Sequence, residues 1–209
     1  GLVRLLCKQR RFPEALAFLN DNDDSQDSIP GFRSVALATT HLDLLARNGS
    51  WEQAHAKAAS LVALLPFNAA HFSSVAAVLA TASDRTDYDT FCRAVIRSNA
   101  ETTDPFIADQ VAKASLLLPP DAALLSPIAR LADRVGAAAS GDPGAAPFFQ
   151  FCKALAEYRQ GHYPAALEWG QKARTGPRPD AESQALYDAV VAYTGIKNLK
   201  VALGVRNLF

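Results

Sequence analysis

The stretch Gly49-Ser50-Trp51-Glu52-Gln53-Ala54 is the part of this sequence that most strongly decides the fold. It gives a glycine turn, an aromatic side chain and, three residues later, an alanine, with further small or apolar residues at Ala58 and Leu61 and a proline at Pro66. Apolar residues at intervals of three and four are typical of one face of an α-helix. A small residue at Ala54 lets a second helix approach closely, because a larger side chain would push the two helices apart. We therefore expect the second helix of a helical hairpin here.

The same order of residues recurs along the chain. Gly161-His162-Tyr163-Pro164-Ala165-Ala166-Leu167 repeats it, followed by Ala173 and Pro177, and Arg11-Phe12-Pro13-Glu14-Ala15-Leu16 repeats it without the glycine. A weaker copy follows 34 residues after the first, with Tyr88 in the place of Ala54 and Cys92 in that of Ala58. Internal similarity at this period indicates a stack of helical hairpins. Counting back from Ala54 predicts that Leu42 and Leu45 face inward from the preceding helix.

These repeats resemble the tetratricopeptide repeat, whose period is also 34 residues. The blocks at 88–93, 102–105, 112–119 and 155–161 look like a divergent subgroup found attached to bacterial Ser/Thr protein kinases and to propeller-repeat proteins in large signalling chains. The resemblance covers about residues 35 to 175. It implies a role in protein–protein interaction within a bacterial signalling assembly, and it does not imply a particular partner.

Glycine, proline and polar clusters divide the rest of the chain into helical segments joined by short turns. Asp104-Pro105 predicts a helix start with an N-cap aspartate and a proline at the first helical position, and Asp121 after Pro119-Pro120 predicts another. We expect an all-α fold, a right-handed α-solenoid of about five to six antiparallel hairpins. Residues 1–209 then form a single solenoid: a partial hairpin (1–20), an acidic loop (21–32), the main repeats (33–178) and C-terminal capping helices or a docking segment (179–209).

The composition disfavours several classes of protein. Twenty-one basic side chains balance twenty-one acidic ones, so the chain lacks the basic excess that binding to nucleic acid or an anionic membrane requires. No apolar run is long enough to span a membrane, and the N-terminus does not look like a secretion signal. Three widely separated cysteines indicate buried thiols in a reducing compartment. We expect a cytoplasmic protein, and a chain that starts at Gly1 and lacks methionine is expected to be a fragment or a processed product.

No motif in the sequence predicts an enzyme. The four histidines are dispersed, and His55 is expected to stack on Trp51, four residues earlier, rather than to bind a metal. Phosphate-binding glycine loops and the nucleophile motif of serine hydrolases do not occur. The acidic pairs at Asp23-Asp24 and around Asp84 and Asp87 are expected in polar loops, where water would solvate both carboxylates. Cys92 and Cys152 occupy apolar helical positions, which favours packing over reactivity. We expect no catalytic residue, cofactor or metal.

In a tetratricopeptide stack the first helix of each hairpin lines a concave groove, which usually takes a segment of a partner. The resemblance places the following residues in this groove: Ala36, Thr39, Asp43, Ala46, Arg47, Ala70, Ser73, Ala77, Ala80 and Thr81. They are small and mostly uncharged, which suits a close-packed helix or a bulky apolar side chain of a partner protein. The alternative is that they only let neighbouring helices pack.

Two functions follow from these interpretations. The first is a scaffold that binds a partner segment through the groove. The second is a structural or self-associating subunit that docks through Val201 to Phe209, an apolar and basic segment. The two differ in whether the isolated chain is a monomer with an open groove, and the sequence does not specify the oligomeric state.

Overall fold

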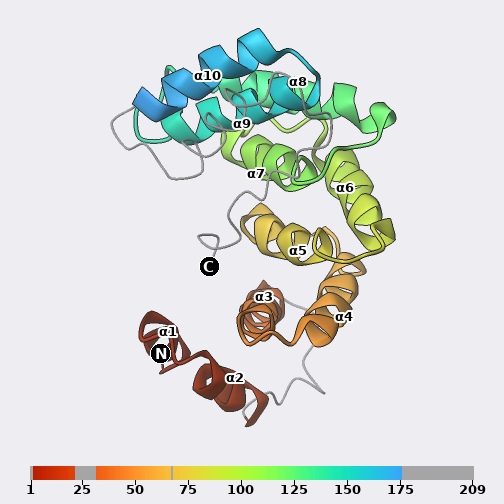
Figure 1. Ribbon diagram of the computed structural model, residues 1–209, viewed down its shortest axis with the longest axis vertical. Coiled ribbons are helices and arrows are strands. Elements are labelled where there is room, and N and C mark those ends of the chain that lie inside the picture. The colour runs from red at the N-terminus through yellow and green to blue at the C-terminus, as the bar shows by residue number, and fades with distance from the viewer. Residues whose placement is uncertain (1, 22–31, 67, 176–209) are drawn as a thin grey trace. The chain divides into compact units, whose positions relative to one another are not determined.

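The computed structural model describes residues 2–21, 32–66 and 68–175 (Figure 1). These residues are helical and contain no strand, which confirms the predicted all-α class. In chain order the elements are α1 (Leu2–Lys8), α2 (Phe12–Asp21), α3 (Phe32–Arg47), α4 (Trp51–Val62), the short 3₁₀ helix η1 (Ala69–His71), α5 (Phe72–Leu79), α6 (Thr86–Asn99), α7 (Pro105–Ser115), α8 (Ala122–Ala138), α9 (Ala146–Arg159) and α10 (Tyr163–Thr175).

The chain forms two compact units that divide within α6, between Thr90 and Phe91. Unit 1 contains α1 to α5 and the first part of α6, and unit 2 contains the rest of α6 and α7 to α10. The right-handed solenoid expected for residues 1–209 as a whole stays a prediction. Most of the expected acidic loop (21–32) and all of the expected C-terminal capping or docking segment (179–209) lie outside the described residues.

Three turns between helices share one backbone geometry. The residue two positions before the aromatic has a positive φ in each: 57° at Arg10, 76° at Gly49 and 81° at Gly161. In each turn the next backbone N–H donates to the carbonyl oxygen five residues earlier: Arg11 to Leu6 at 2.9 Å, Ser50 to Leu45 at 2.9 Å and His162 to Glu157 at 3.0 Å. This bond is the signature of a Schellman C-cap, which ends a helix with a left-handed residue. The three copies of the motif that the sequence marks most clearly therefore share one turn conformation.

The small residues of the repeat lie at the centres of the hairpins. Ala15, Ala54 and Ala166 are buried, as are Ala58 and Ala173 in the following turn of their helices. Leu42 and Leu45 are buried on α3, which confirms that they face inward. Tyr88 and Cys92 are also buried, so the weaker copy keeps the same inward positions with larger side chains. Helices joined by a short turn pack on one another: α1 on α2, α3 on α4, and α9 on α10.

Alternate helices are also in contact. Helix α3 packs on α5 in unit 1, and α7 packs on α9 in unit 2. Arginines strengthen this second set of contacts in unit 2. The guanidinium of Arg159, at the end of α9, donates to the carbonyl oxygens of Leu116 and Leu117 after α7 at 2.9–3.1 Å. Arg134 on α8 donates in the same way to Ala100 and Thr102 after α6. Each arginine thus satisfies carbonyls that the end of a helix leaves without an intrahelical partner.

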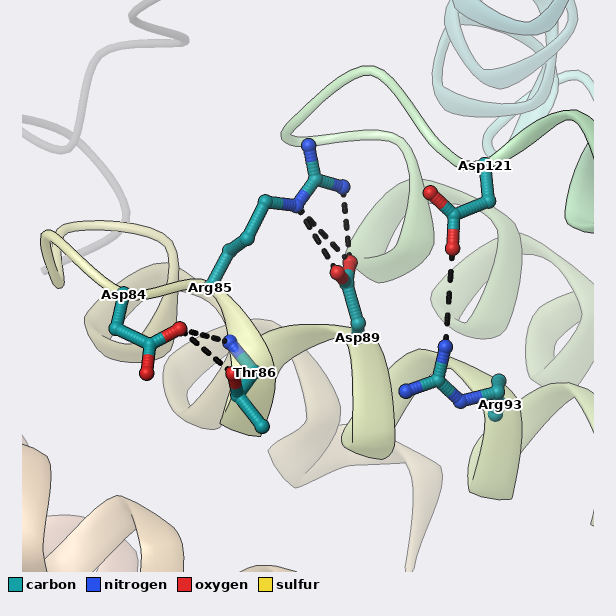
Figure 2. A network of polar contacts seen from close by, with 6 residues as sticks. All are labelled: Asp84, Arg85, Thr86, Asp89, Arg93 and Asp121. Atoms are coloured by element: carbon teal, nitrogen blue, oxygen red, sulfur yellow. Dashed lines mark hydrogen bonds and ion pairs between the residues drawn. The ribbon is translucent and has the colours of Figure 1, made fainter.

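The two predicted aspartate caps differ. Asp104 Oδ1 accepts hydrogen bonds from the backbone N–H of Phe106 at 2.8 Å and of Ile107 at 3.4 Å, which confirms it as the N-cap of α7. Asp121 occupies the N-cap position of α8, but its carboxylate makes no capping bond. It lies instead 3.7 Å from Nη1 of Arg93 (Figure 2). The prediction that Asp121 caps α8 as Asp104 caps α7 is wrong, because the carboxylate is directed to the guanidinium.

The start of α6 uses Asp84, which the sequence analysis placed in a solvated loop, together with Asp89 in the first turn of the helix. The carboxylate of Asp84 accepts from the backbone N–H of Thr86 at 2.9 Å and from its hydroxyl at 2.6 Å (Figure 2). These hydrogen bonds lower the pKa of Asp84. Arg85 holds both carboxylate oxygens of Asp89, with Nη2 2.8 Å from Oδ1. The acidic side chains here organise the first turn of a helix, where negative charge is favourable.

The shared turn geometry predicts opposite effects for two kinds of substitution. A Cβ added at Gly49 or Gly161 meets no atom within 4 Å, so only backbone conformation opposes it. A left-handed conformation costs a non-glycine residue about 1–2 kcal/mol. We expect Gly49→Ala and Gly161→Ala each to lower the free energy of unfolding by about 1 kcal/mol, and Arg10→Gly to raise it by a similar amount. Urea denaturation measures the free energy of unfolding of all three variants. Destabilisation by Arg10→Gly would contradict the shared geometry.

The buried alanines predict that the hairpins do not tolerate larger side chains. We expect Ala54→Leu and Ala166→Leu to lower the free energy of unfolding by about 1–3 kcal/mol, because added methylenes overpack a close helix contact. Ala56, on the exposed side of α4, provides a matched control. Thermal unfolding should show a lower midpoint temperature for Ala54→Leu and Ala166→Leu and little change for Ala56→Leu. Equal midpoints in all three would show that the alanines do not set the helix spacing.

Candidate functional site

The predicted groove residues of unit 1 lie on α3 and on the segment from η1 to just past the end of α5, two stretches that pack together. Thr39 and Ala77 are each only 3% exposed, and Ala46 is buried as well. Ala36, Asp43, Arg47, Ser73 and Ala80 are partly exposed, whereas Ala70 and Thr81 are exposed. The structure favours the packing alternative for Thr39, Ala46 and Ala77. The partner-binding role of the set as a whole stays a prediction.

Polar contacts join α3 to α5 along this face. Oγ1 of Thr39 lies 3.0 Å from the carbonyl oxygens of Val35 and Ala36 and 3.1 Å from Nδ1 of His71. One turn later on α3, the carboxylate of Asp43 accepts a hydrogen bond from Ser74. The two helices are therefore held by polar as well as apolar contacts.

Burial raises the pKa of Asp43 to about 6, although the hydrogen bond from Ser74 and the charge of Arg47 both act to lower it. Oδ1 of Asp43 is buried and receives no hydrogen bond from the described part of the chain. The guanidinium of Arg47 lies over the ring of Phe12, 4.9 Å from its centroid. Ionising a carboxyl group in this position costs free energy, because the charged form loses contact with water.

Unit 2 carries an aromatic cluster that the sequence did not predict. Four phenylalanines of α7 and α9 belong to it: Phe106, Phe148, Phe149 and Phe151. The rings of Phe106 and Phe149 meet edge to face at 5.2 Å. Phe149 and Phe151 are buried, but Phe106 is 55% and Phe148 is 44% exposed. The exposed pair belongs to neighbouring packed helices, so the α7–α9 aromatic cluster presents apolar surface to solvent.

A lysine and an aspartate lie within this cluster. Nζ of Lys113 is 5.6 Å from the ring centroid of Phe148 and 5.5 Å from that of Phe151. The same ammonium donates to Oδ2 of Asp109, one turn earlier, at 3.0 Å. Burial raises the pKa of Asp109, against the charge and hydrogen bond of Lys113 and a hydrogen bond from Cys152. The pair resembles Asp43 and Arg47 in unit 1: an acid, a base four residues later and a hydrogen-bonding side chain on the alternate helix.

A second charged cluster joins α8, α9 and the turn before α10. Lys153 is buried; its ammonium lies 2.6 Å from Oδ1 of Asp133 and also bonds Glu157, whose other oxygen lies 2.8 Å from Nδ1 of His162. Gly136 leaves room for the lysine stem, since a Cβ there would lie 3.3 Å from Cγ of Lys153.

The pKa values of this second cluster fit a structural role. Burial opposes both charges, but the hydrogen bonds outweigh it. The pKa of Lys153 is therefore raised and that of Glu157 is lowered. Both groups keep their charges near neutral pH, whereas efficient proton transfer needs a pKa near the working pH. This arrangement fastens three helical segments and does not resemble an acid–base pair.

Several smaller expectations can be compared with the structure. His55 contacts the Trp51 ring in a tilted arrangement with centroids 6.3 Å apart, and its Nε2 lies 2.9 Å from Oγ1 of Thr81. Cys92 and Cys152 are buried, as predicted, and burial raises the pKa of Cys152 well above its usual value. Within the described ranges, no three His, Cys, Asp or Glu side chains gather closely enough to hold a metal ion. Among the helices described, none combines the length and apolar character needed to cross a membrane.

A sequence signal for the exposed phenylalanines does exist. The dipeptide Pro-Phe opens both α7, as Pro105-Phe106, and α9, as Pro147-Phe148. Proline suits the first turn of a helix, so the pair marks equivalent positions on two alternate helices. The spacing of the repeat motif points to the second helix of each hairpin, and for this reason it missed the pair.

Comparison of the chain with protein-family models, curated proteins and solved structures gives no match. The function must therefore be argued from the residues of this chain.

The Asp109–Lys113 pair predicts a strong coupling between two substitutions. We expect Lys113→Met to lower the free energy of unfolding by roughly 2–4 kcal/mol at pH 7, because it leaves a buried carboxylate without its cation. The double variant Asp109→Asn/Lys113→Met should recover most of this loss, since neither charge remains. Urea denaturation of both single variants and the double variant gives the coupling energy. A double variant as unstable as Lys113→Met would show that the pair is not held by charge.

Proposed function

We propose that this chain is a protein-binding module, a stack of helical hairpins of the tetratricopeptide kind that holds a partner segment and catalyses no reaction. The observation that carries the proposal is the α7–α9 aromatic cluster, with Phe106 and Phe148 exposed on two helices that pack side by side. Exposed aromatic side chains on a rigid surface are typical anchors of protein interfaces.

The packing of alternate helices supports this role. In a hairpin stack the first helices of successive hairpins lie beside one another and line one face. Contacts of α3 with α5 and of α7 with α9 are consistent with this arrangement, and the three Schellman turns that share one hydrogen-bond pattern support a repeated hairpin. The proposed arrangement is a right-handed solenoid, and the proposed setting is a bacterial signalling assembly.

The chemistry of the cluster indicates which kind of side chain the partner segment presents to it. Phe106 and Phe148 supply apolar surface that gains free energy when it is removed from water. Lys113 is charge-balanced by Asp109, so the cluster carries no strong net charge. We propose that the partner presents large apolar side chains from a helix or an extended segment. A strongly charged peptide is not expected to bind here.

Site-specific crosslinking tests this proposal. A photoreactive phenylalanine is placed at position 148 and, as a matched control, at position 64, where a leucine of unit 1 is similarly exposed. The source-cell lysate is irradiated and the crosslinked peptides are identified by mass spectrometry. We expect one partner to crosslink reproducibly at position 148, through a segment rich in apolar residues, and not at position 64.

Substitution then separates binding from folding. We expect Phe106→Ser/Phe148→Ser to weaken binding of that partner by about 10-fold or more, as anchors at the centre of an interface do. Leu64→Ser should leave binding unchanged. Ala70→Glu/Ser73→Glu tests the predicted groove of unit 1 by the same assay. Unchanged binding in all three variants, or crosslinks only to further copies of this chain, would contradict the proposal and favour a self-associating subunit.

A further inference from the structure

The contact between α3 and α5 contains a charge that its surroundings compensate poorly. The carboxylate of Asp43 takes its hydrogen bond from a neutral hydroxyl, that of Ser74. Its Oδ1 is buried and accepts no bond from any described residue. In unit 2 the corresponding carboxylate, Asp109, also has a buried Oδ1 that accepts no bond from the described residues, but its Oδ2 is bonded directly to an ammonium at 3.0 Å. The two units therefore treat a buried acid at the same kind of helix contact differently.

We propose that the α3–α5 contact is a proton-controlled joint, which is closed when Asp43 is protonated and loosened when Asp43 is ionised. A neutral carboxyl group can remain buried between two helices at little cost, whereas an ionised one gains free energy by reaching water. Opening of this contact would expose the carboxylate. The inference concerns unit 1 and does not depend on the binding role proposed for the α7–α9 aromatic cluster.

The other charged and titratable groups near the α3–α5 contact do not cancel the cost of ionising Asp43. On α3 itself, Arg47 is the charged group that acts on Asp43, and its own pKa is lowered by burial. From α1 and the turn after it, Cys7 and Arg10 act on Arg47. Among the described residues, no side chain of α2 or α4 is a cause of the shift in the pKa of Asp43.

Helix α5 and η1 bring one titratable residue to the contact, His71, which is bonded to Thr39 one turn before Asp43. Burial lowers the pKa of His71. Burial thus disfavours the charged imidazolium at this contact, and His71 is not among the groups that shift the pKa of Asp43.

The direction of the effect follows from proton linkage. The pKa of Asp43 is about 6 in the folded chain, against 3.8 for an unperturbed group. A group whose pKa is raised on folding contributes stability that is fully present below its unfolded pKa and is lost as the pH rises through its folded pKa. The joint is therefore tightest below about pH 4 and loosens as the pH rises from about 4 to about 6. The shift corresponds to a change of roughly 100-fold in the opening equilibrium.

Hydrogen exchange of the backbone amides tests the joint. Protection of α3 and α5 is measured from pH 4.5 to pH 7.5 and corrected for the intrinsic pH dependence of exchange. We expect protection to fall by roughly 30-fold over this range in the unmodified chain, because part of the full change lies below pH 4.5, and to change much less in Asp43→Asn. Glu52→Gln, at an exposed position of α4, is the matched control and should behave as the unmodified chain.

A second variant keeps the test decisive if Asp43→Asn does not fold. Ser74→Ala removes the hydrogen bond that favours the ionised form, so the midpoint of the protection change should move to higher pH. An NMR titration of the Asp43 carboxyl carbon should give a midpoint near 6. A midpoint near 4, or the same pH dependence of protection in the unmodified chain and in Asp43→Asn, would overturn the proposal.

Discussion

Close approach of paired helices at a buried alanine is the constraint on which both units depend. Ala15, Ala54 and Ala166 each lie three residues after an aromatic side chain, and each aromatic follows a left-handed residue by two positions. The Schellman turn fixes where the second helix of the hairpin begins, and the alanine fixes how near it comes to the first. Arg10 shows how strong this requirement is, because a non-glycine residue adopts the left-handed conformation there.

Contacts between alternate helices add polar specificity to this apolar framework. Arg134 and Arg159 reach back to carbonyls at the ends of α6 and α7, where a helix has acceptors to spare. Lys153 fastens α8 to α9 and, through Glu157, to the turn before α10. Such bonds are directional, so they fix the register of one helix on another more closely than apolar packing does. Buried charge is costly to leave unpaired, and in unit 2 it is paired directly.

The two units differ in what their alternate-helix contacts expose. In unit 1, Thr39 and Ala77 are buried, and the contact centres on the carboxylate of Asp43. In unit 2, the equivalent contact ends in two phenylalanines that remain open to solvent. One contact is thus suited to respond to protons and the other to hold an apolar segment. The buried carboxylate and the exposed phenylalanines occupy the same kind of place in the fold. Both lie where alternate helices meet, on the side chains that packing within a hairpin leaves uncovered.

The sequence alone determined the helical class, the hairpin register and the inward residues, because these depend on local spacing. A glycine turn, an aromatic and an alanine act within a few residues of one another, and they fix the hairpin wherever they occur. Only one of the two predicted aspartate caps forms: the side chain of Asp104 accepts from the backbone N–H of Phe106 in α7, whereas that of Asp121 is directed to an arginine of another helix. The tertiary structure alone decided which polar residues are buried and which aromatic residues stay exposed. Asp43, Asp109 and Phe148 owe their environments to helices distant in sequence, and side-chain spacing within one helix carries no information about what packs against it.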